Sequence, residues 1–348
     1  MLKKYWKVLA NTAFLIAVFV VTFFLVFKDQ NMSKVMDSIQ QAKSGYLVLG
    51  LILALLYVCS ESVIIHYLMH TVKQKVSFLR CIIYSFVGFF FSAVTPSATG
   101  GQPVQVIWMK RDKISVAVSS LVLMIVTAAY KTVLMIMCVL AIIFEWSFLT
   151  DNALQIWLLI VFGIICNVSF VAFLVVAVFR KSWLTCMIGK SIFWLGKHRM
   201  IQDRQRWLRR IWKVLSKYDK SADYIKKNKR VLVHVILITF LQRLCLFTVT
   251  YVVYRAFGLK GISAFEIIAL QTIIALAVDS LPLPGAMGAS ESSFLIIFLT
   301  IFGEKFVLPG MLLSRGISYY AMLLISAMIT LVTHIIGGRE KNIESGGL

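Results

Sequence analysis

Long apolar segments separated by short polar segments dominate this chain. Runs of about 20 apolar residues are long enough to cross the ~30 Å hydrocarbon core of a bilayer as α-helices. Two other apolar segments, near 79–110 and 264–303, are interrupted by prolines and glycines. The pattern predicts an all-α polytopic membrane protein with eight hydrophobic segments, six of which are full spans near 8–27, 45–69, 114–144, 153–179, 231–257 and 309–335.

The two interrupted segments read "SAVTPSATGGQPVQ" over 92–105 and "DSLPLPGAMGASESSF" over 279–294. A helix from Pro103 to Lys110 would be only ~12 Å long and one from Ser290 to Gly303 only ~21 Å long, so neither would cross a bilayer. We therefore predict two re-entrant helical hairpins of opposite orientation. The alternative for each segment is one kinked span followed by a surface piece.

The positive charges predict the orientation. Basic clusters lie before the first span, over 70–80, over 110–113, over 180–230 and near the end of the chain. The positive-inside rule places these clusters in the cytoplasm, which predicts a multi-pass cell-membrane protein with both termini cytoplasmic. The basic start resembles a signal peptide, but no small-residue cleavage site follows its apolar run. We therefore predict that 8–27 is a retained span.

The two breaks share a pattern. "PSATG" at 96–100 and "PGAMG" at 284–288 both read P-x-A-x-G, and each break lies within the order span, hairpin, span. Inverted repeats with interrupted helices at matching positions are typical of transporters, whose substrate sites lie at the interruptions. The pattern therefore predicts an inverted repeat with a transport site at the breaks.

The breaks also have a chemistry. Backbone groups freed by a break must be buried in protein or line a polar cavity. The second helical arm of each hairpin would start at the break, with Pro103 in the first turn of one arm and Ser290 as the N-cap of the other. Helix N-termini attract anions such as phosphate. The alternative is that the turns only allow close packing. We predict substrate-binding residues in the first break (Thr95, Pro96, Ser97, Gly100, Gly101, Gln102) and in the second (Asp279, Pro284, Gly285, Gly288, Ser290, Glu291).

Several ionisable residues fall inside predicted spans, where each costs roughly 2.5–3.5 kcal/mol on insertion scales and needs an interior partner. Arg243 and Arg315 are the predicted partners of Glu291 and are also predicted to bind substrate. Glu61 and Lys131 are predicted to form a charge relay, and a structural ion pair is an equally favoured interpretation.

Composition excludes several functional classes. The chain is 60% hydrophobic, with a mean hydropathy of +0.86, far above a soluble domain. None of its six cysteines forms a C-x-x-C motif, so we predict neither a disulfide framework nor a metal site. No nucleotide-binding loop or hydrolase motif is present, so we predict no cofactor and favour a transporter over an enzyme.

The net charge of +21 is concentrated in the 180–230 loop, which holds sixteen Lys/Arg and three Asp. Apolar residues recur there at helical spacing, which predicts an amphipathic helix on an anionic leaflet, with Trp207, Arg209, Arg210, Trp212 and Lys213 at the membrane surface. Topology already requires positive charge here, so nucleic acid is a weaker alternative. We divide the chain into an integral membrane domain (1–336) that contains this loop and a disordered cytoplasmic tail (337–348).

"TPSATGGQPVQ" followed by "KRDKIS", and "PLPGAMGASE" followed by "SRGISYY", resemble the flippase-like transmembrane region of lysylphosphatidylglycerol synthase, the membrane half of the multiple peptide resistance factor. The family motif falls on Pro282, Pro284, Gly285, Gly288 and Glu291, and its following arginine matches Arg315. Ala286 replaces a usual glycine, and Gln102 and Gln105 stand where many members carry charge.

The resemblance implies a stand-alone bacterial or archaeal form, without the soluble synthase domain, that moves a phospholipid or other charged-headgroup lipid between leaflets. Its expected partners are anionic membrane phospholipids and a soluble lipid-modifying enzyme. Two alternatives stay open: secondary transport of a small polar anion, and a membrane role in phosphatidylglycerol lysylation. Oligomeric state, transport direction and energy source are not predicted.

Overall fold

The computed structural model describes residues 32–144, 157–179 and 228–345. The predicted first span and the predicted amphipathic helix with Trp207, Arg209, Arg210, Trp212 and Lys213 lie outside these residues. Every regular element in the described part is helical. The elements are α2 Met32–Gln40, α3 Ser44–Thr71, α4 Phe78–Ala93, α5 Gly101–Arg111, α6 Val116–Phe144, α8 Trp157–Phe179, α11 Lys229–Ala256, α12 Ala264–Val278, α13 Ala289–Arg315, the π-helical turn η2 Gly316–Ala321 and α14 Met322–Ser345.

The polytopic class is confirmed. Five helical stretches in the described residues are long and apolar enough to cross a membrane: Ser44–Thr71, Val116–Phe144, Trp157–Leu174, Lys229–Ala256 and Ala289–Ile335. Helices α4 and α12 are apolar but have only 16 and 15 residues, about 24 and 22 Å. Both are shorter than the ~30 Å core of a bilayer.

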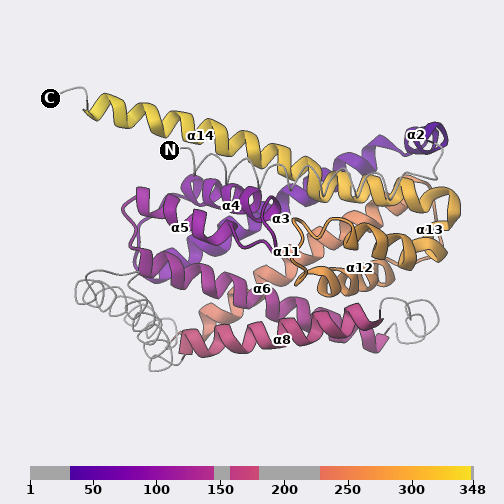
Figure 1. The fold of residues 1–348 in the computed structure, drawn as a ribbon, viewed down its shortest axis with the longest axis horizontal. Helices are drawn as coiled ribbons and strands as arrows, with labels where there is room; N and C mark the ends of the chain where they lie inside the picture. The colour runs from indigo at the N-terminus through magenta and orange to yellow at the C-terminus, as the bar shows by residue number, and fades with distance from the viewer. Residues whose placement is uncertain (1–31, 145–156, 180–227, 346–348) are drawn as a thin grey trace, which may run out of the picture.

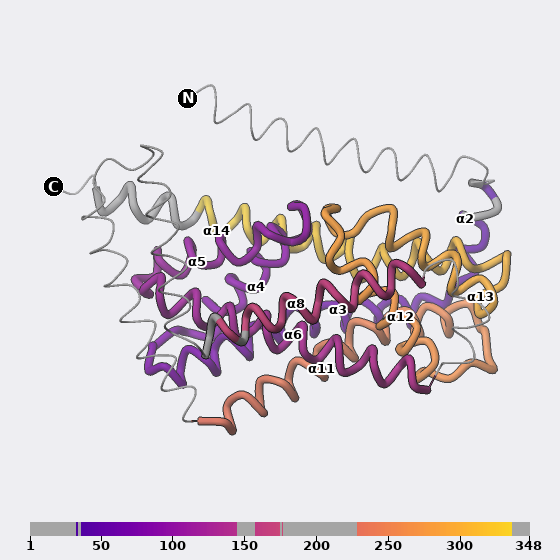
Figure 2. The backbone as a smooth tube through the Cα atoms, turned by 60° about the horizontal axis from the view of Figure 1, so that its bottom comes forward, coloured from indigo at the N-terminus to yellow at the C-terminus, as the bar shows by residue number. Residues whose placement is uncertain are grey.

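The short helices belong to two hairpins that point toward each other. In Figure 1, α4 and α5 start and end at one end of the bundle, and their connection lies near its middle. The hairpin of α12 and the first part of α13 opens toward the opposite end, and its connection lies beside that of α4 and α5 in both views (Figures 1 and 2). The first arm of each hairpin begins with a serine N-cap, Ser77 or Ser263, whose hydroxyl accepts from a backbone N–H three residues later.

The helix that contains the last predicted span (309–335) starts earlier and ends later than that span, although its apolar stretch ends at Ile335 as predicted. The backbone leaves helical geometry at Gly303 (φ 69°, ψ 167°), where the chain reverses, so Pro309 lies inside the helix that follows. Helix α14 continues past Gly337 to Ser345, where a disordered tail from 337 was expected.

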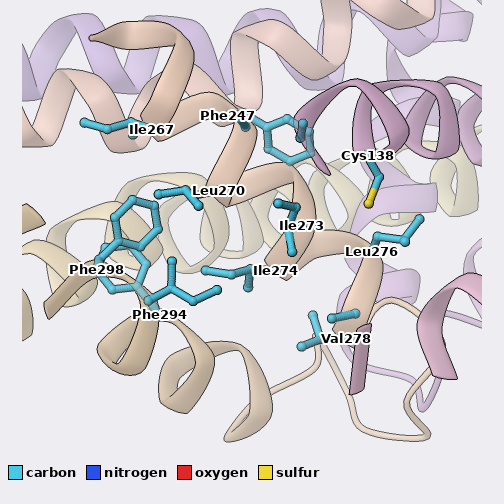
Figure 3. Packing of buried hydrophobic residues seen from close by; sticks show 14 of the residues in the cluster. Cys138, Phe247, Ile267, Leu270, Ile273, Ile274, Leu276, Val278, Phe294 and Phe298 are labelled. Atoms are coloured by element: carbon cyan, nitrogen blue, oxygen red, sulfur yellow. The ribbon is translucent and has the colours of Figure 1, made fainter. Parts of the chain in front are cut away.

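Apolar side chains from both halves of the chain form the core. Its largest cluster joins α6, α11, α12 and α13, and Figure 3 shows Phe294 and Phe298 of α13 against Leu270 and Ile274 of α12. The rings of Phe294 and Phe298 are 4.4 Å apart between centroids. Large apolar side chains such as Leu158, Leu241 and Leu331 remain exposed on the outer helices. A surface of this kind suits contact with lipid rather than water.

Gly163 sets how closely α8 approaches α12. A Cβ at this position would lie 2.5 Å from the carbonyl oxygen of Leu276, so only glycine fits. We expect Gly163→Ala to lower the melting temperature of the purified protein in detergent. The overpacking cost of about 1–3 kcal/mol exceeds the roughly 1 kcal/mol that alanine gains in helix propensity.

The matched control is Gly45→Ala, where an added Cβ meets nothing within 4 Å. This variant gains at most the same propensity and makes no such contact, so its melting temperature should equal or exceed that of the wild type. An equal response of the two variants would contradict the assigned role of Gly163.

Candidate functional site

The first break is a tight turn held by its own side chains. Ser97 and Ala98 both adopt left-handed backbone angles (φ 50° and 53°), and the N–H groups of Ala98 and Thr99 donate to the carbonyls of Thr95 and Pro96. The Thr95 hydroxyl accepts from the N–H of Gly100 at 2.8 Å and donates to the Phe91 carbonyl at 2.6 Å. Thr95 therefore satisfies backbone groups on both sides of the break.

The second break has the same backbone form. Gly285 and Ala286, at the positions matching Ser97 and Ala98, have φ 57° and 53°. The N–H groups of Ala286 and Met287 donate to the carbonyls of Leu283 and Pro284, which repeats the bonds of the first turn. The shared P-x-A-x-G pattern therefore corresponds to a shared turn.

The two turns touch each other. Pro96 and Pro284, the first residues of the two motifs, form an isolated antiparallel backbone bridge. The Ser97 hydroxyl donates to the Leu281 carbonyl at 3.3 Å. The Tyr319 hydroxyl, from η2, donates to the Ala93 carbonyl at 2.9 Å, and the Tyr319 ring packs on Gly285. Segments almost 190 residues apart in sequence thus form one structural unit.

A cavity of about 270 Å³ lies between the breaks. Ser97, Ala98, Gly285 and Ala286 of the turns line it. The walls combine aromatic and aliphatic side chains with convergent polar groups, the mixture that is usual in ligand sites. The polar lining residues are Tyr57, Ser92, Ser97, Tyr130, Thr250, Gln271, Asp279, Ser290, Ser314, Arg315, Ser318 and Tyr319.

Arg315 and Glu291 join the second break to the last span. Arg315 Nε donates to Glu291 Oε1 at 2.9 Å, and Arg315 Nη2 donates to the Gly285 carbonyl at 2.9 Å. The other carboxylate oxygen of Glu291 accepts from the Gly288 N–H at 2.7 Å, as in a helix capping box. The side chains of Glu291 and Arg315 are only 5% and 16% exposed, so this pair is largely shielded from solvent. The guanidinium also lies 4.6 Å from the Tyr319 ring centroid.

A second group of buried charges surrounds Asp279, which also lines the cavity. Asp279, which ends α12, accepts from Lys131 Nζ and from the Tyr130 hydroxyl, both on α6. The Arg243 guanidinium stacks on Tyr130 at 3.8 Å and lies 5.0 Å from the Tyr57 ring centroid. Arg243 is 9% exposed, and within the described residues its Nε has no hydrogen-bond partner. Arg243 is therefore a buried cation whose Nε–H has no acceptor among the described residues.

Glu61 and the glutamines of α5 form a third polar contact. Gln105 Nε2 donates to Glu61 Oε1 at 2.8 Å and to the Tyr84 carbonyl at 3.1 Å, and its amide fills the space above Gly88. Gln102 Nε2 donates to the Thr127 hydroxyl on α6. These two glutamines fix α5 against α3, α4 and α6.

The structure brings many of the predicted site residues together and separates others. Both turns, Asp279, Ser290 and Arg315 surround one cavity, and Arg315 rather than Arg243 pairs with Glu291. Glu61 and Lys131 have different partners, Gln105 and Asp279, so they do not form a direct pair. Ser290 is not an N-cap, because α13 begins at Ala289 with Gly288 as its cap. The glycine permits the positive φ (85°) found there.

Sequence reasoning missed the aromatic and amide residues of the site. Tyr319 connects the two breaks. Its one signal in the sequence is its position four residues after Arg315, which places Tyr319 and Arg315 on the same helical face. Tyr130 neighbours the selected Lys131 and binds the same carboxylate. Thr250 and Gln271 also line the cavity, but in the sequence only their polarity distinguishes them from the apolar residues of their helices.

We expect Gly285→Ala to destabilise the site. Alanine at φ 57° costs about 1–2 kcal/mol, and its Cβ would lie 2.2–2.4 Å from Tyr319 ring and hydroxyl atoms, so the ring must move away from Ala93. The expected total loss is about 2–3 kcal/mol of unfolding free energy, measured by denaturant unfolding in detergent.

Gly258→Ala is the control, because Gly258 also has positive φ (75°) but open space around it. It should show only the backbone cost. A loss of stability no larger in Gly285→Ala than in this control would show that the contact with Tyr319 is unimportant.

Within the described residues no group of three or more His, Cys, Asp or Glu could hold a metal ion. Comparison with known proteins gives two findings. The family model described as "Lysylphosphatidylglycerol synthase TM region" matches residues 12–326. The chain is also similar to the "UPF0104 membrane protein PH1989" of Pyrococcus horikoshii, with 25% identity over 267 residues that cover 74% of this chain and 78% of the relative.

Proposed function

Because the chain belongs to the family of the lysylphosphatidylglycerol synthase transmembrane region, we propose that it moves a phospholipid, or another lipid with a charged headgroup, between the two leaflets of the cell membrane. The observation that carries the proposal is the polar cavity between the two broken hairpins, with Arg315 on its wall. Interrupted helices that meet around a polar site are a recurring arrangement in membrane transporters.

The proposal includes a topology. The hairpins of α4–α5 and α12–α13 would be re-entrant, entering from opposite faces and meeting near the middle of the bilayer. The end of the bundle that carries Lys75, Arg80, Arg111 and Lys113 would face the cytoplasm, together with both termini. The order span, hairpin, span would then occur twice, inverted.

The size of the cavity limits what enters it. At about 270 Å³ it lies just below the range of ~300–1,000 Å³ that is usual for ligand pockets. It can therefore hold a polar headgroup but not two acyl chains. We propose that the headgroup crosses through the cavity while the acyl chains stay in the bilayer.

The charges suggest how a phosphate would bind. Arg315 is the cation that lines the cavity, and its guanidinium can exchange part of its contact with Glu291 for a lipid phosphate. Arg243, with its unpartnered Nε, would add positive potential from behind the Tyr57 and Tyr130 rings. Glu291 would compensate Arg315 whenever the cavity holds no lipid.

The test uses purified protein in liposomes that contain headgroup-labelled phosphatidylglycerol. An impermeant quencher added outside reports the labelled fraction that reaches the outer leaflet over time, beside protein-free liposomes of the same composition. Faster exposure with protein supports the proposal. The proposal would be refuted if the protein did not speed the exposure of any labelled lipid. The lipids tested would have anionic, zwitterionic and cationic headgroups, each with and without an ion gradient.

A second candidate is secondary transport of a small polar anion. The small volume of the cavity favours it, because such an anion needs no path for acyl chains. Uptake of radiolabelled phosphate or a small carboxylate into the same liposomes, with lipid exposure unchanged, would select this candidate.

A further inference from the structure

A second cavity of about 300 Å³ lies at the end of the bundle where α3 turns into α4 and α5 turns into α6. It is separate from the cavity between the breaks, and the two share no lining residue. Its lining is strongly basic: Lys75, Val76, Ser77, Arg80, Tyr84, Arg111, Asp112 and Lys113.

The one acid of this pocket is already engaged. Asp112 accepts from the Tyr84 hydroxyl through one carboxylate oxygen, and its other oxygen lies 3.7 Å from Arg80 Nη1. Arg111 lies 5.1 Å from the Trp108 ring centroid, a contact that orients its guanidinium without neutralising it. Within the part of the chain that the structure describes, no ion pair engages Lys75, Arg111 or Lys113. The pocket therefore carries three uncompensated positive charges around a fixed Asp112–Tyr84–Arg80 unit.

The backbone adds to this potential. Helix α4 begins at the pocket, with Ser77 as its N-cap, so its first N–H groups face the same region as the cations. Asp112 holds the Tyr84 phenol and the Arg80 guanidinium in place, and no ion pair between described residues occupies the other three cations. Cations with free donors around a concave surface are suited to an anion with several oxygen atoms, above all a phosphate.

We propose that this pocket binds the phosphate of an anionic phospholipid from the leaflet at that end of the bundle. The end of the bundle lies at headgroup level in a membrane protein of this architecture, so lipid phosphates are the anions present there at the highest density. Free phosphate has the same chemistry, and the experiment separates the two sources. The site does not depend on translocation through the central cavity.

The test is calorimetric titration of the full-length protein in nonionic detergent with three soluble probes: short-chain phosphatidylglycerol, short-chain phosphatidylcholine and inorganic phosphate. We expect phosphatidylglycerol to bind best. The double variant Arg111→Gln/Lys113→Gln should bind it about tenfold to a hundredfold more weakly, because two charge-assisted contacts are lost. Glu266→Gln, a charge change on α12 that lines neither cavity, should leave this binding unchanged.

Lys110→Gln is the matched control, because Lys110 is exposed in the same turn of α5 but does not line the pocket. Its affinity should stay within about twofold of the wild type, since exposed surface charges contribute little. An equal loss in Lys110→Gln, or wild-type affinity in the double variant, would overturn the proposal. Binding of inorganic phosphate without binding of phosphatidylglycerol would also overturn the assignment to lipid.

Discussion

Arg315→Ala is expected to abolish lipid movement and to destabilise the folded chain. The substitution leaves the Glu291 carboxylate buried without its cation and frees the Gly285 carbonyl, so the second break loses its connection to the last span. Breaking one partner of a buried ion pair costs about 3–5 kcal/mol. Chemical unfolding in detergent measures this cost, and the quenching assay in liposomes measures lipid movement.

The double variant Glu291→Gln/Arg315→Ala distinguishes stability from function. Removing the orphaned carboxylate should restore part of the lost stability. Lipid movement should stay absent, because the cation that binds the phosphate is still missing. Lys305→Ala removes an exposed cation on the same helix that contacts the neutral Gln41 amide and the Phe306 ring. It should leave both quantities unchanged. Wild-type lipid movement by Arg315→Ala would contradict the proposed phosphate site.

Asp279→Asn is expected to have an effect of similar size on stability. Asp279 neutralises Lys131, and both side chains are at most 15% exposed. The amide keeps the shape of the carboxylate and can still accept from Tyr130, but it leaves Lys131 as an unpaired buried cation beside Arg243. We expect a loss of about 3–5 kcal/mol in the free energy of unfolding.

Lys131→Met in the Asp279→Asn background provides the test of this explanation. Methionine removes the orphaned charge and fills similar volume, so the melting temperature should rise again above that of the single variant. Glu266→Gln, a neutralisation in the first turn of the same helix, should cost at most about 1 kcal/mol. Failure of the second substitution to rescue the first would show that Asp279 acts through contacts other than the ion pair.

Helix positions follow closely from local pattern. The spans predicted at 45–69, 114–144 and 231–257 lie within two residues of α3, α6 and α11 at each end. The breaks at 96–100 and 284–288 are where the sequence places them, because proline and glycine act locally on the backbone. The sequence also indicated that the two turns are alike, since both P-x-A-x-G segments have similar positive φ angles at their second and third residues.

The sequence by itself therefore determined the membrane class, the helical segments, the two breaks and the buried charges that need partners. Only the tertiary structure decided which partners they have: Arg315 for Glu291, Lys131 for Asp279, Gln105 for Glu61 and two tyrosine rings for Arg243. The physical reason is that neighbouring residues determine a break or a span. A contact between Ala93 and Tyr319, or between Pro96 and Pro284, depends instead on how helices distant in sequence rotate and cross.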